Sequence, residues 1–101
     1  MDQKIQLIHP KGKKAVSIEK GKYDLLKKEV LSTLKKNGES SHAEILNAIT
    51  EDFKRDKIKF EGSLEWYLEW VKLDLEARKE ITRLKVSSQL KFMIPLISRQ
   101  F

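Results

Sequence analysis

The segment from Ser63 to about Lys79 constrains the fold more than any other part of the chain. At about 100° per residue, apolar side chains cover more than half of this helix in two adjoining faces, and a mixed-charge strip completes the circle. We therefore expect a mostly buried helix whose exposed strip is slightly acidic. The first face contains Leu64, Tyr67, Leu68, Val71 and Leu75, the second Trp66, Trp70, Leu73 and Ala77, and the strip Glu65, Glu69, Lys72, Glu76 and Lys79.

Two further helices are predicted before this segment. Apolar residues at helical spacing begin near Glu19, and Asn37-Gly38 is a typical helix end. Ser41 and Glu44 have the spacing of a capping box, in which each side chain bonds the other residue's backbone amide. The sequence therefore predicts a second helix from about Ala43 to Phe53.

Short strands are predicted at both ends of the chain. Residues 4–8 alternate between apolar and polar side chains, a turn at His9-Pro10-Lys11-Gly12 follows, and residues 15–18 can return as a partner. After the third helix, residues 81–85 and 90–94 have strand character, and Ser87-Ser88 suits a hairpin turn. Whether the N-terminal strands join the C-terminal hairpin is left open by the sequence.

Three helices followed by a hairpin is the order of a winged helix. The predicted fold class is thus α+β: a winged helix-turn-helix of three helices with a C-terminal β-hairpin wing and a short N-terminal strand or hairpin. A length of 101 residues suits one core, so we expect a single domain over residues 1–101. The absence of cysteine excludes disulfides and thiolate chemistry. A polar Met1–Lys4 and the lack of a long apolar run predict a cytoplasmic protein without membrane contact.

No catalytic motif is found. His9 and His42 do not lie in a metal-binding spacing, and the position of His42 near Glu44 is better explained by helix capping. The glycines are scattered as turn and cap residues, and the carboxylate pairs have the spacing of solvated helix faces. We therefore predict that the protein is not an enzyme and uses no metal and no small-molecule cofactor.

Charge is unevenly distributed along the chain. Residues 1–38 hold ten lysines against four acids, residues 39–80 seven basic against eleven acidic side chains, and residues 81–101 four basic side chains and no acid. One hypothesis is therefore that the basic ends bind nucleic acid, DNA in the first instance, through phosphates with weak sequence preference. The alternative for these lysines is a solubilising surface. The candidate residues are Lys11, Lys13 and Lys14 in a loop, Lys28 and Lys35 on the first helix, and Arg83, Lys85 and Lys91 on the wing.

The third helix argues against reading of DNA sequence. Its polar strip lacks Arg, Asn and Gln, and acidic side chains are repelled by phosphates. Asp74 and Arg78 are four residues apart and project toward the apolar arc, which favours a structural ion pair over a DNA contact for Arg78.

A second hypothesis is a protein-interaction or homodimerisation module. Trp66 and Trp70, together with the C-terminal segment 92–97, can supply an apolar surface for a partner. Packing of both tryptophans over the small β-sheet is the favoured interpretation, because so small a domain needs large side chains in its core.

The block from Trp66 to Arg78, followed by Ile81 and Arg83, resembles the signature of a family of small bacterial proteins of unknown function that are thought to be winged-helix-like. The resemblance covers most of the chain and implies a fold and a bacterial origin, but no activity and no functional residues. Lys79 stands where such sequences commonly have glycine, so we expect a less sharply defined end of the third helix. The resemblance also includes Tyr23, His9-Pro10, Lys11-Gly12 and Gly62-Ser63.

Overall fold

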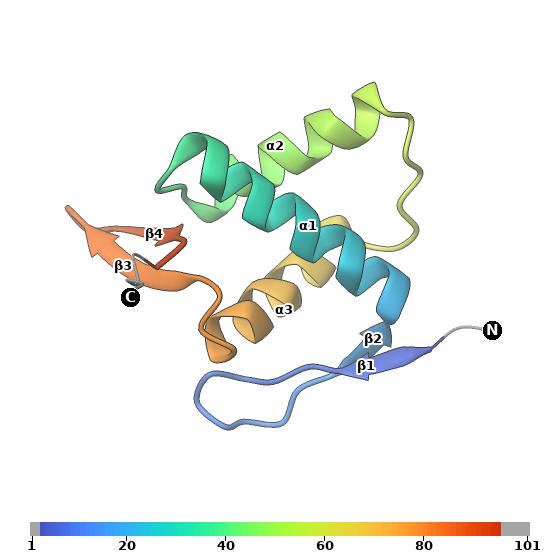
Figure 1. The fold of residues 1–101 in the computed structure, drawn as a ribbon, viewed down its shortest axis with the longest axis horizontal. Helices are drawn as coiled ribbons and strands as arrows, with labels where there is room; N and C mark the ends of the chain where they lie inside the picture. The colour runs from blue at the N-terminus through green and yellow to red at the C-terminus, as the bar shows by residue number, and fades with distance from the viewer. Residues whose placement is uncertain (1–2, 96–101) are drawn as a thin grey trace, which may run out of the picture.

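The computed structural model describes residues 3–95, which form three helices and two separate antiparallel strand pairs (Figure 1). This agrees with the predicted α+β class, including the C-terminal hairpin and the short N-terminal hairpin. In the part of the chain described, no helix is both long and apolar enough to cross a membrane. In chain order the elements are β1 (Lys4–Gln6), β2 (Ser17–Glu19), α1 (Lys20–Asn37), α2 (His42–Arg55), α3 (Leu64–Ala77), β3 (Thr82–Val86) and β4 (Gln89–Met93).

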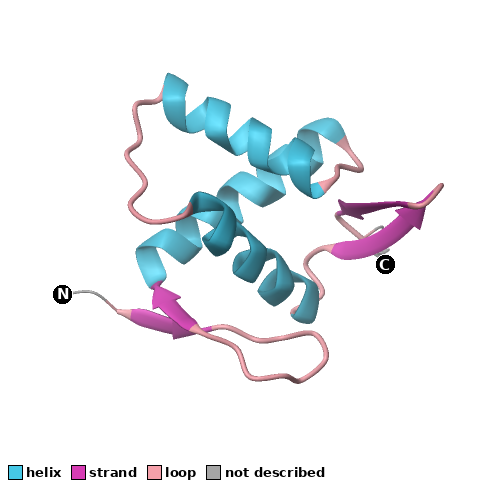
Figure 2. Ribbon diagram, turned by 180° about the vertical axis from the view of Figure 1, so that it is seen from behind, coloured by secondary structure: helices cyan, strands magenta, loops and turns pink. Residues whose placement is uncertain are grey.

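The two strand pairs lie on different sides of the helices and do not join into one sheet (Figures 1 and 2). In the first pair Ile5 is opposite Ile18, and in the second Arg83 is opposite Phe92. The C-terminal hairpin is attached to the α1–α2 connection by an isolated bridge, in which the backbone amides and carbonyls of Ser40 and Phe92 exchange hydrogen bonds of 3.0 and 2.8 Å. The hairpin is therefore fixed to the helices through its second strand.

The helix starts follow the predicted signals. Ser41 Oγ accepts a hydrogen bond from the amide of Glu44 (3.2 Å), and Glu44 accepts one from the amide of Ser41 (2.8 Å). This confirms the predicted capping box, which satisfies two amides that have no partner within the helix. Ser63 caps α3 in the same way by accepting from the amide of Trp66 (3.2 Å).

The end of α3 is sharply defined, so the expectation of a loose end at Lys79 is wrong. Lys79 adopts a left-handed conformation (φ 64°), its amide donates to Glu76, and the amide of Glu80 donates to the carbonyl of Leu75 (2.9 Å). These two bonds form a Schellman motif with lysine in place of glycine. The motif forms because it satisfies the last helix carbonyls, although a side chain at this φ is strained.

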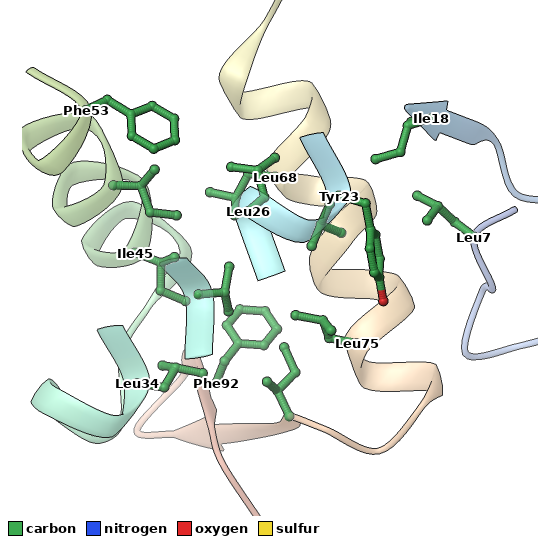
Figure 3. Packing of buried hydrophobic residues seen from close by; sticks show 14 residues of the cluster. Leu7, Ile18, Tyr23, Leu26, Leu34, Ile45, Phe53, Leu68, Leu75 and Phe92 are labelled. Atoms are coloured by element: carbon green, nitrogen blue, oxygen red, sulfur yellow. The ribbon is translucent and has the colours of Figure 1, made fainter. Parts of the chain in front are cut away.

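The hydrophobic core lies between the three helices and is closed by residues from each strand pair and its loop (Figure 3). Phe92 enters from the C-terminal hairpin, and Leu7 and Ile18 cover the opposite end. The helices contribute Tyr23, Leu26, Val30 and Leu34 from α1, Ile45, Ile49 and Phe53 from α2, and Leu68, Val71 and Leu75 from α3.

A buried carboxylate on α3 ties the helices to the N-terminal segment. Asp74 is completely buried, and it accepts hydrogen bonds from Arg78 Nε (2.8 Å), the Tyr23 hydroxyl (2.6 Å) and the amide of Ile8 (2.9 Å). The predicted ion pair of Arg78 with Asp74 is therefore confirmed. Burial and the hydrogen bond to Asp74 raise the pKa of Tyr23, so the phenol stays a proton donor. Arg78 consequently has a structural role.

Replacement of Lys79 by glycine should stabilise the protein. Glycine adopts the left-handed conformation without a Cβ clash, so we expect Lys79→Gly to raise the free energy of unfolding by about 1 kcal/mol in urea denaturation. Lys79→Ala is the matched control, because it removes the same long side chain but keeps the Cβ and should bring no gain. An equal change in the free energy of unfolding for the two variants would show that removal of the lysine side chain, and not relief of the backbone strain, causes the effect.

Candidate binding surface on the third helix

The side of α3 next to its core-facing side carries a row of partly exposed apolar residues, here called the outward stripe: Trp66, Trp70, Leu73 and Ala77. Trp70 also packs against the edge of the core. Trp66 is 46% exposed, whereas the other three are half-buried. The two indole rings meet edge to face with centroids 6.4 Å apart. The expectation that both tryptophans are packed is therefore wrong for Trp66, and α3 is less buried than its apolar pattern predicts. The reason is that, of the four residues in the stripe, Trp70 is the one that packs against the core in the described part of the chain.

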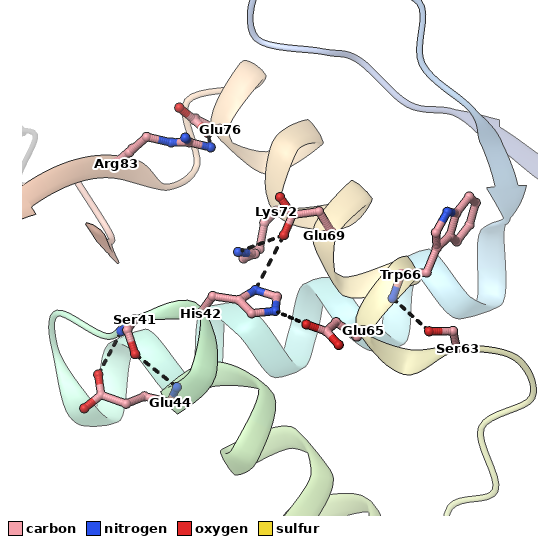
Figure 4. Close-up of polar contacts among 10 residues, drawn as sticks. All are labelled: Ser41, His42, Glu44, Ser63, Glu65, Trp66, Glu69, Lys72, Glu76 and Arg83. Carbon is pink, nitrogen blue, oxygen red and sulfur yellow. Dashed lines mark hydrogen bonds and ion pairs between the residues drawn. The ribbon is translucent and has the colours of Figure 1, made fainter. Parts of the chain in front are cut away.

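Carboxylates line the flank of the stripe that faces α2. His42, in the first turn of α2, lies between them, with Nε2 3.3 Å from Glu65 and Nδ1 3.6 Å from Glu69 (Figure 4). Both carboxylates are solvent-accessible, with Glu65 at 68% and Glu69 at 53% side-chain exposure. The side chain of His42 is thus explained by a contact with α3 rather than by capping of its own helix.

Lys72 departs most from the predicted polar strip of α3. Only 3% of Lys72 is exposed, its ammonium lies 4.2 Å from the centroid of the Phe92 ring, and Glu69 is 3.4 Å away. Burial lowers the pKa of Lys72, and the neighbouring Glu69 opposes this shift. The prediction of an exposed Lys72 is wrong because the hairpin covers this side of the helix.

Arg83 is engaged within the protein. Its Nη2 lies 3.0 Å from a Glu76 carboxylate oxygen (Figure 4). Its guanidinium lies 5.5 Å from the centroid of the Phe92 ring. Of the predicted phosphate-binding residues, Arg83 is therefore the one with a clear structural role, which is to hold β3 against α3.

The loop between β1 and β2 borders the other flank of the stripe. The hydrogen bond from Ile8 to Asp74 holds the loop beside α3, and the side chain of Ile8 is 44% exposed there. The turn that follows is stabilised by the amide of Lys11, which donates to His9 Nδ1 (3.0 Å). A groove at the C-terminal end of the stripe is lined by His9, Pro10, Lys11, Lys13, Leu73, Glu76 and Arg83.

The structure brings together only some of the predicted phosphate-binding residues. Lys11, Lys13 and Lys14 are exposed in the loop, and the groove places Lys11 and Lys13 near Arg83. Strand alternation puts Lys85 on the same face of the hairpin as Arg83 but Lys91 on the opposite face. Lys28 and Lys35 are exposed on α1, and Lys35 borders a separate hollow beside Met93 and Ile94 of the hairpin.

The predicted apolar surface of segment 92–97 is partly wrong. Phe92 is a core residue with 2% exposure, and residues 93–95 are half-buried. Leu96 and Ile97 lie outside the described residues. Sequence analysis also missed Ile8 as a surface residue, although the alternation that turns Ile5 and Leu7 inward turns Ile8 outward.

The surface around the outward stripe combines apolar, acidic and basic side chains. Within residues 3–95, no group of three or more His, Asp or Glu side chains is placed so that it could hold a metal ion. The outward stripe offers aromatic and aliphatic contact area, the α2 side offers carboxylates, and the loop offers exposed lysines. Such a combination of an exposed aromatic anchor with a polar rim is typical of protein interfaces.

Comparison with known proteins gives a family but no function. The sequence model of a family of unknown function (DUF6958) matches residues 4–92, and so includes all three helices and most of the C-terminal hairpin. No curated protein and no solved structure matches the chain.

The two tryptophans should differ in their contribution to stability. Trp70 packs against the core, so Trp70→Ala should lower the free energy of unfolding by roughly 2–3 kcal/mol, whereas Trp66→Ala should lower it by less than about 1 kcal/mol. Urea unfolding followed by circular dichroism measures both without relying on indole fluorescence. Equal losses would contradict the assignment of Trp66 to the surface.

Proposed function

The chain belongs to this family of unknown function, and we propose that it is a protein-interaction domain of the winged-helix type, which binds its partner with the outward stripe of α3. The winged-helix assignment is supported by the order of three helices and a hairpin, and by the bridge from Ser40 to Phe92 that attaches the hairpin to the α1–α2 connection. In DNA-reading members of this class, the third helix presents its outward face to the major groove.

The observation that carries the proposal is the exposure of Trp66 on this outward face. Base edges are read mainly by Arg, Lys, Asn or Gln, and the stripe contains none of these. An exposed tryptophan beside a second one is the type of residue that dominates the energy of protein interfaces. The face used for bases in DNA-reading winged helices is here suited to a protein surface.

A photo-crosslinking experiment tests this function. Benzoylphenylalanine placed at position 66 should form a discrete protein adduct in the cells from which the protein comes, and the same group at Lys28 on α1 should not. An adduct of twice the chain mass would identify a second copy as the partner. Adducts with nucleic acid alone, or the same adducts from both positions, would contradict the proposal.

Nucleic-acid binding through phosphates is a second candidate function, favoured by the lysines of the loop. Lys11, Lys13 and Lys14 are exposed, and within residues 3–95 none of them forms an ion pair. Lysines that are free of carboxylates can neutralise phosphates and release counterions without reading sequence. Lys85 on the hairpin can add a further contact.

Charge reversal tests this candidate. Lys13→Glu with Lys85→Glu should weaken binding to a random duplex about tenfold or more in fluorescence anisotropy, and should reduce the slope of log affinity against log salt. Lys54→Glu with Lys59→Glu is the matched control, because it changes the net charge equally at exposed positions outside the predicted phosphate-binding residues. Equal weakening by both pairs would show that net charge, and not the loop and hairpin, causes the binding.

A further inference from the structure

The carboxylates of Glu65 and Glu69 each have one oxygen that takes no hydrogen bond within the described part of the protein. Glu65 uses Oε2 toward His42, and Glu69 uses Oε1 toward both His42 and Lys72. In the described part of the chain, the second oxygen of each carboxylate takes no hydrogen bond from the protein. Both oxygens are therefore free to accept a hydrogen bond from outside.

The position of these acids makes the surface complementary to a particular type of partner. Glu65 and Glu69 lie in the N-terminal half of α3, which also carries Trp66 and Trp70, and helical spacing puts the two acids along one flank of the outward stripe. Figure 4 shows both carboxylates on the side of α3 that faces His42. The protein as a whole carries a net charge of +6, so these two carboxylates are opposite in sign to the net charge of the molecule. A partner that approaches here gains from positive charge next to apolar side chains.

We propose that the outward stripe of α3 is a docking site for a basic amphipathic segment of a partner protein. This inference rests on the proposed protein-interaction function and adds the chemistry of the partner. Apolar side chains of the segment pack on Trp66, Trp70 and Leu73, and its lysines or arginines pair with Glu65 and Glu69. A helix provides this arrangement, since its apolar and basic residues recur every three to four positions.

Two model peptides test the chemistry of the partner. We would use an amphipathic helical peptide of about 18 residues composed of leucine and lysine, and a second peptide with glutamate at every lysine position. Fluorescein anisotropy at roughly 0.15 M salt gives the affinities, and the emission of the two tryptophans reports on contact with the stripe. We expect the lysine peptide to bind about fivefold or more tightly than the glutamate peptide. Non-specific attraction by a protein of net charge +6 predicts the opposite preference.

Charge-neutralising variants locate the site. Glu65→Gln with Glu69→Gln should abolish the preference for the lysine peptide, whereas Glu39→Gln with Glu51→Gln changes the net charge equally at exposed positions elsewhere and should preserve it. Because Glu69 also contacts the buried Lys72, Glu65→Gln alone serves as a variant that leaves this pair intact, and it should reduce the preference.

The outcomes separate this inference from the function on which it rests. Tighter binding of the glutamate peptide with a change in tryptophan emission would overturn the basic partner but keep the stripe as a protein-binding surface. No binding of the lysine peptide up to roughly 1 mM would also overturn the inference, while crosslinking at position 66 decides the function independently. Retention of the preference in the Glu65 and Glu69 double variant would overturn the role of these carboxylates.

Discussion

The positions of α1 and the N-terminal loop relative to α3 depend on the hydrogen bonds made by the carboxylate of Asp74. A charge in the core is strongly unfavourable unless it is paired and hydrogen-bonded, and Asp74 meets this requirement through three donors from α1, α3 and the N-terminal loop. Because Tyr23 and Ile8 donate to the same group, α1 and the loop are fixed relative to α3 at once. Loss of this carboxylate would leave a buried hydroxyl and a backbone amide without their partner, so the loop would lose its position beside the outward stripe.

The opposite side of α3 is held by a different pair of contacts. Lys72 places its ammonium over Phe92, and Arg83 pairs with Glu76, so the hairpin packs against the helix through two cations. The sequence predicts Lys72 on an exposed strip and Arg83 as a phosphate ligand. One flank of α3 is thus occupied by the loop and the other by the hairpin and α2. The outward stripe is the part of the helix that these contacts leave open.

Much of this fold is predictable from the sequence because it depends on local signals. The Ser41–Glu44 capping box, the Ser87-Ser88 turn and the Asp74–Arg78 pair each involve residues at most four positions apart, so their spacing determines them. The candidate surface is less predictable, because the sequence shows two apolar faces on α3 without showing which one meets the core. That choice depends on where Phe92 packs and on the hydrogen bond from the amide of Ile8 to Asp74, and both contacts join segments that are distant in the chain. For the same reason Lys72 and Trp66 exchange their expected environments.

The acids of α3 differ in what they contribute to the fold, and this difference bears on function. Glu76 is largely covered and is needed to hold Arg83, so its charge is explained by structure. Glu65 is mostly exposed, and its contact with His42 is of the surface type that contributes little to stability. An exposed carboxylate beside an exposed tryptophan is therefore not required by the packing of this domain. In the proposed docking, the tryptophan acts by apolar contact and the carboxylate by charge, and both lie in the N-terminal half of α3.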